Sequence, residues 1–70
     1  MPGRAILVWS GVEDPGRHHE QMLFTALSHA ALDPIQVPKP GVILLKQTVD
    51  RVRASTLQHP GWSLYEEKPQ

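Results

Sequence analysis

The chain of 70 residues contains no cysteine, and this absence excludes disulfides, thiolate metal ligands and cysteine nucleophiles together. It also has no excess of either charge, because seven Lys and Arg residues balance seven Asp and Glu residues. A domain that binds nucleic acid through phosphates usually carries a basic stripe, so the scattered cations here argue against that function. Near-zero net charge does little to keep copies of a protein apart, and it therefore favours self-association.

The chain has no apolar run that approaches the roughly 20 residues needed to span a bilayer. The longest such runs cover residues 5–9 and 42–45, and the N-terminal region has too short an apolar stretch for a secretory signal. We therefore expect a cytoplasmic protein with no membrane contact. The length predicts one domain over residues 1–70. Such a small domain buries only about 60% of its unfolded surface, which makes oligomerisation or a partner a plausible source of further burial.

Strand-like runs and helix-period stretches alternate along the chain. The predicted strands cover residues 5–9, 35–37, 42–46 and 62–66. A helix is predicted over residues 15–32, where Asp14-Pro15 is a favourable start and Pro34 a stop. Residues 38–41 form a turn cluster of Pro, Lys, Pro and Gly, which indicates a hairpin between the second and third strands.

The stretch over residues 48–57 is open to two interpretations. As a strand it alternates poorly, because Val49 and Val52 would face opposite sides of a sheet. As a helix it places both valines on one face, with Thr48 as the cap. The sequence favours the helix, and His59-Pro60-Gly61 then ends it.

The order strand, helix, strand, strand, helix, strand is that of the ferredoxin-like βαββαβ sandwich, an α+β fold. Right-handed crossovers would place both helices on one face of a four-stranded antiparallel sheet. The other face would stay open for a partner, lined or edged by the candidate residues Trp9, Leu44, Trp62 and Tyr65. The predicted core consists of Ile6, Val8, Leu23, Ala26, Leu27, Ala30, Ile35, Val37, Ile43, Leu45, Val49, Val52 and Leu64.

Three short motifs resemble the heavy-metal-associated domains of metallochaperones and metal-pumping ATPases. They are residues 8–12 (Val-Trp-Ser-Gly-Val) at the loop start, 26–27 (Ala-Leu) in the helix and 61–62 (Gly-Trp) at the last strand. The resemblance implies the ferredoxin-like fold. The two metal-ligating cysteines of that family would fall at Asp14 and Arg17, so no thiolate site for copper(I) exists there. We therefore expect no bound metal and no cofactor.

A narrower resemblance relates residues 49–53 (Val-Asp-Arg-Val-Arg), preceded by Val37-Pro38, to the potato inhibitor I family of serine-protease inhibitors. It implies a scissile bond between Leu45 and Lys46 in an exposed loop, with Arg51 and Arg53 as loop supports. This alternative requires an extended loop before residue 50 and a strand over residues 50–53. The ferredoxin-like hypothesis requires a hairpin followed by a helix in the same stretch.

No pattern of catalytic residues is visible in the chain. His18, His19 and Glu20 are adjacent on a helix and point about 100° apart, so they do not converge on one ion. RNA-recognition domains stack bases on aromatics of the two central strands, and the corresponding stretches here contain only Trp9. The sequence thus predicts a non-enzymatic module, a homodimer or a partner-binding protein, that acts through its sheet face or a strand edge. RNA binding is a further alternative.

Overall fold

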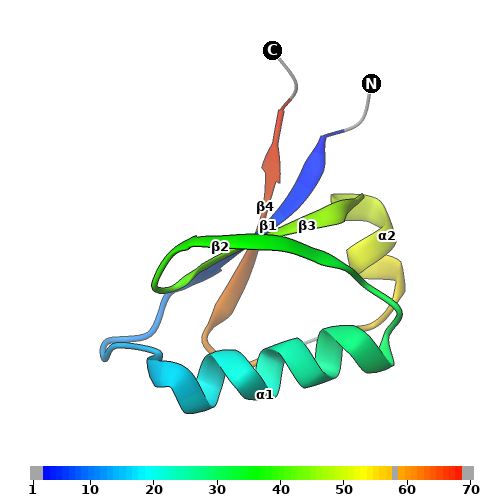
Figure 1. Ribbon diagram of the computed structural model, residues 1–70. Helices are drawn as coiled ribbons and strands as arrows, with labels where there is room; N and C mark the ends of the chain where they lie inside the picture. The colour runs from blue at the N-terminus through cyan, green and yellow to red at the C-terminus, as the bar shows by residue number, and fades with distance from the viewer. Residues whose placement is uncertain (1–2, 58, 69–70) are drawn as a thin grey trace.

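The structure, a computed structural model, describes residues 3–57 and 59–68. Four strands form one antiparallel sheet in the order β2-β3-β1-β4, which makes β1 and β3 the central strands. The strands are β1 (Arg4–Trp9), β2 (Pro34–Lys39), β3 (Val42–Thr48) and β4 (Trp62–Glu67), and the helices are α1 (Gly16–His29) and α2 (Val49–Ala54). The predicted α+β class, with a four-stranded antiparallel sheet and two helices, is confirmed (Figure 1).

Helix α1 is shorter at both ends than the predicted helix over residues 15–32. Pro15 occupies the N-cap position, and no side chain there accepts a hydrogen bond. At the other end Ala31 adopts a positive φ of 57°, which turns the chain out of the helix. The N–H of Leu32 then donates to the carbonyl of Leu27 at 2.8 Å, the bond that closes a helix end of this type.

Helix α2 confirms the helical interpretation of the ambiguous stretch, over fewer residues than the predicted 48–57. The hydroxyl of Thr48 accepts a hydrogen bond from the backbone N–H of Arg51 at 3.4 Å, as expected for an N-cap. Val52 is the only residue of α2 that is fully buried. Neither α1 nor α2 is long and apolar enough to cross a membrane, and no other helix occurs in the described part of the chain.

Both helices pack on the same face of the sheet and share one core with it. Figure 1 shows α1 lying below the sheet and α2 beside the end of β3. Leu23 and Leu27 from α1 join Val52 from α2 in this cluster. The other buried members are Ala5, Leu7, Leu32, Ile43, Leu45 and Trp62.

Five residues of the predicted core lie outside the observed cluster and the side chains packed on it: Ile6, Val8, Ala26, Ile35 and Val37. Ala5 and Leu7, rather than Ile6 and Val8, are the buried residues of β1. Residues 5–9 are apolar throughout, so alternation in the sequence does not mark which face is buried. Ile35 and Val37 are 38% and 37% exposed, because β2 is an edge strand with a neighbour on one side only.

Candidate functional site

The sheet face opposite both helices carries apolar side chains in two adjacent rows. Leu44, Ile6 and Tyr65 are paired across β3, β1 and β4, and they form the first row. Val42, Val8 and Ser63 are paired in the same way and form the second. We call these six residues the open sheet face. The side chains of the two rows lie on the same side of the sheet, since residues two apart in a strand point the same way.

The open sheet face is apolar and is not part of the core. Its four aliphatic side chains, Ile6, Val8, Val42 and Leu44, are partly exposed and do not pack against the buried cluster. Tyr65 beside them is 56% exposed. Directly opposed aliphatic and aromatic residues stabilise neighbouring strands, and here they also leave a continuous apolar strip facing outward. Contiguous apolar surface of this kind is typical of interaction sites.

Charged side chains of both signs border this strip at one end of the strands. Arg4 on β1 and Glu67 on β4 form an ion pair with 2.9 Å between Nη2 and Oε2, and their side chains are 50% and 38% exposed. Lys46 on β3 is exposed and follows the buried Leu45, so the alternation of the strand directs it to the open side. The strip therefore has a cation on its β3 side and a carboxylate on its β4 side.

The structure divides the four predicted partner-binding residues between the two faces of the sheet. Leu44 and Tyr65 lie on the open sheet face, as expected. Trp62 is 9% exposed and belongs to the core, so it lies in the edge strand β4 but does not line the open side. Trp9 pairs with it across β1 and β4 and points to the same helix-covered side. There its ring stacks on His19 with a centroid distance of 5.4 Å and meets the edge of the Trp62 ring at 5.5 Å.

Four residues of the open sheet face, Ile6, Val8, Val42 and Ser63, were not among the residues predicted from the sequence, and three of them are aliphatic. The signal was present, because residues 5–9 and 42–45 are apolar at every position. Such runs make both faces of a strand apolar, whereas a sheet with one solvated face usually shows alternation. Strands that are apolar on both faces, as these two runs are, predict an apolar open sheet face as well as an apolar core.

The residues of the protease-inhibitor alternative do not form an exposed loop. Leu45 is 0% exposed in the central strand β3, and Lys46 follows it in the same strand. Arg51 and Arg53 lie on the outer side of helix α2, where Arg53 is 3.8 Å from the carboxylate of Asp50. The strand that the inhibitor fold requires over residues 50–53 is therefore a helix, and the bond between Leu45 and Lys46 is inaccessible to a protease.

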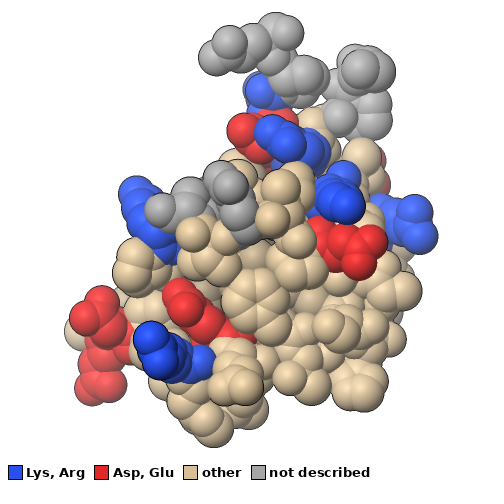
Figure 2. Space-filling model, viewed as in Figure 1, with Lys and Arg blue, Asp and Glu red and all other residues tan. Residues whose placement is uncertain are grey.

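The described residues give little support to nucleic-acid or metal chemistry. Trp9, the aromatic residue of the central strands, faces the helices and is not on the open sheet face. In the view of Figure 2, acidic and basic side chains are interspersed and do not form a stripe of one sign. Within residues 3–57 and 59–68, no three His, Asp or Glu side chains are grouped to hold a metal ion.

Comparison with known proteins finds no family model, no curated protein and no solved structure that matches this chain.

Proposed function

We propose that this chain is a small, non-enzymatic binding module of ferredoxin-like architecture, and that its open sheet face binds a second copy of the chain. The observation that carries the proposal is the apolar strip of Ile6, Val8, Val42 and Leu44 with Tyr65, on the side of the sheet opposite both helices. The strand order β2-β3-β1-β4, with both helices packed on one face, supports the architecture.

The small size of the core supports association through this face. Among the described residues, nine make up the buried apolar cluster, and a domain of 70 residues has limited means of burying more within one chain. Packing two open sheet faces together would remove the aliphatic strip and Tyr65 from water in both copies. Burial of apolar surface is the main favourable term in such association.

The charges that border the strip favour a second copy over a partner of one charge sign. A two-fold axis that runs along the strands, between two stacked sheets, places the β4 side of one copy over the β3 side of the other. Glu67 of one copy then lies near Lys46 of its partner, and the reciprocal pair forms as well. Complementary charges of this kind set the register of an interface, and zero net charge leaves no overall repulsion to overcome.

Sedimentation of the wild type and two variants tests the proposal. We expect a dimer at micromolar concentration, and we expect Leu44→Glu to be monomeric because it buries an unpaired carboxylate at the centre of the interface. Met22→Glu is the matched control, since Met22 is 50% exposed on α1 and on the far side of the sheet. This control should remain dimeric, and circular dichroism should show that both variants are folded.

Two results would contradict the proposal. A wild type that stays monomeric through the micromolar range would show that a second copy is not the occupant, and a different protein would have to be sought for this face. A dimer that survives Leu44→Glu but is lost in Met22→Glu would place the interface on the helical side.

A further inference from the structure

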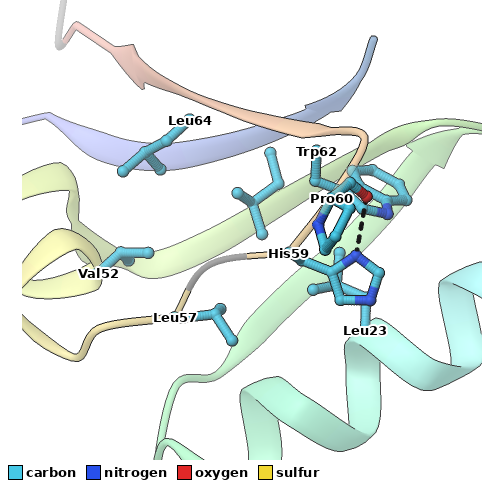
Figure 3. A pocket seen from close by; sticks show the side chains of 8 residues that line it. Leu23, Val52, Leu57, His59, Pro60, Trp62 and Leu64 are labelled. Atoms are coloured by element: carbon cyan, nitrogen blue, oxygen red, sulfur yellow. Dashed lines mark hydrogen bonds between the residues drawn. The ribbon is translucent and has the colours of Figure 1, made fainter. Parts of the chain in front are cut away.

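A cavity of about 470 Å³ lies on the helix-covered side of the sheet, away from the open sheet face. It is bounded by the sheet, by both helices and by the connection between α2 and β4 (Figure 3). The volume falls within the range of roughly 300–1,000 Å³ that is typical of small-molecule sites. The lining residues are Leu7, Leu23, Val52, Leu57, His59, Pro60, Trp62 and Leu64.

The cavity has one apolar end and one end with polar groups. Figure 3 shows Val52, Leu57 and Leu64 on one side, whereas His59, Pro60 and Trp62 are grouped on the other. The apolar end offers only hydrocarbon to a ligand. A bound molecule must therefore be apolar over most of its length, and its polar atom belongs at the end of the cavity that holds His59 and Trp62.

Trp62 supplies a polar group that has no partner among the described residues. Its side chain is largely buried, and its Nε1 is closed to solvent without a hydrogen bond to any described residue. An indole N–H is a donor only, and a buried donor without an acceptor costs free energy. The Nε1 of Trp9, in contrast, donates to the carbonyl of Glu13. The indole N–H of Trp9 thus has an acceptor, whereas that of Trp62 has none among residues 3–57 and 59–68.

His59 closes this end of the cavity and does not satisfy the indole. Its Nδ1 lies 3.1 Å from the carbonyl oxygen of Pro60, which accepts only, so in the neutral ring Nδ1 carries the hydrogen. Among the described residues, the imidazole has no hydrogen bond besides this one to its neighbour in the chain. Changes of side-chain rotamer are common on binding, and such a change at His59 would give a ligand access to Trp62.

We propose that this cavity binds a small apolar molecule that carries a carbonyl oxygen, and that the oxygen accepts a hydrogen bond from Nε1 of Trp62. The hydrocarbon part of the ligand packs against Leu57, Val52 and Leu64. The inference is independent of the proposed function, because the cavity and the open sheet face lie on opposite sides of the sheet.

Acetophenone and ethylbenzene are matched probes, since they share a carbon skeleton and only the first has an acceptor. In ¹H–¹⁵N spectra the chain gives two indole signals, one from Trp9 and one from Trp62. We expect acetophenone to shift the Trp62 indole signal saturably and leave that of Trp9 nearly unchanged. Ethylbenzene should bind about tenfold more weakly, the difference expected for one hydrogen bond.

Two variants separate the hydrogen bond from simple filling of the cavity. Trp62→Phe keeps an aromatic ring and removes the donor, so the two probes should then bind equally, as followed on backbone signals. His59→Ala removes the covering ring and should bind acetophenone at least as tightly as the wild type. Equal binding of both probes to the wild type would overturn the proposal, and so would the absence of any saturable shift up to the solubility of the probes.

Discussion

The two faces of the sheet are made of the same kinds of side chain but have different surroundings. On the helix-covered face, Leu7, Ile43 and Leu45 are at most 5% exposed beneath α1 and α2. On the opposite face, Ile6 and Leu44 alternate with them in the same strands and remain partly exposed. The difference lies in what covers each face, and it shows that an apolar strand does not by itself define one core.

The polar groups of the two faces differ as well. The open sheet face is bordered by long, exposed cationic side chains, Arg4 and Lys46 among them. On the covered face Trp62 has a buried N–H that finds no acceptor within the described part of the chain. A protein surface with a charged rim suits a protein partner, whereas an enclosed donor suits a small ligand.

Replacing Leu45 and Leu44 in turn by alanine should give the largest contrast between the faces. Leu45 is fully buried, so Leu45→Ala should lower the free energy of unfolding by about 2–5 kcal/mol through lost transfer energy and a cavity. Leu44→Ala, one residue earlier on the open sheet face, should cost about 1 kcal/mol or less within a single chain. Urea unfolding, at protein concentrations below those of association, measures both values.

The order of these two costs is the decisive feature. A larger loss for Leu44→Ala than for Leu45→Ala would mean that the open sheet face is covered within the single chain. Repeating the unfolding at higher protein concentration should enlarge the cost of Leu44→Ala alone, because association would then contribute to stability.

The second contrast concerns two glycines with positive φ. Gly61 lies on the covered side of the sheet, and Gly16 lies on the surface. Gly61 has a φ of 84°, and a Cβ there would come closer than 3.0 Å to the ring of Trp9. Gly61→Ala should therefore cost about 3 kcal/mol, from backbone strain together with displacement of the ring. Gly16 has a φ of 66° with open space around it, so Gly16→Ala should cost about 1–2 kcal/mol from the backbone alone.

Thermal unfolding of the two glycine variants provides the measurement. Near-ultraviolet circular dichroism adds a second readout, because the packing of Trp9 against Trp62 should change in Gly61→Ala and not in Gly16→Ala. Equal costs and unchanged aromatic signals in both variants would show that Trp9 is not held against Gly61.

Sequence patterns predicted the elements of this fold well and the faces of its strands poorly. Thr48 as a cap and the valines at 49 and 52 were sufficient to identify α2, since local signals determine a short helix. The run over residues 5–9 contains no polar residue, and the orientation of β1 therefore depends on which side the helices cover, a tertiary property. Trp62 illustrates the same limit, because a large aromatic residue suits both a core and an interface.

The candidate site was only partly predictable for a related reason. Leu44 and Tyr65 lie on the open side, as the sequence predicted. The apolar strip itself depends on the strand register, which pairs Ile6 with Leu44 on one side and with Tyr65 on the other. Register is set by the pairing of strands that are distant in sequence, and a single sequence does not encode it in a local pattern. The cavity beside Trp62 was not predicted at all, since it depends on how the connection after α2 packs.

The smallest expected effect comes from the ion pair at the border of the open sheet face. The side chain of Arg4 is 50% exposed and that of Glu67 is 38% exposed, so solvent screens their attraction. A double-mutant cycle with Arg4→Ala and Glu67→Ala should give a coupling of about 0.2–1 kcal/mol, decreasing as salt is raised. Chemical unfolding of the four proteins at low protein concentration measures this coupling within a single chain.

The same cycle becomes informative about the open sheet face when it is repeated above the concentration of association. Contact with a second copy would exclude water from the border of the strip, and the coupling between the two charges should then rise, because screening by solvent is reduced. A coupling that stays the same at both concentrations would leave Arg4 and Glu67 outside the interface and would contradict the proposed pairing of Glu67 with Lys46. The ion pair of Arg4 and Glu67, although weak, thus tests where the boundary of the interface lies. The larger effects at Leu44 and Leu45 do not locate that boundary.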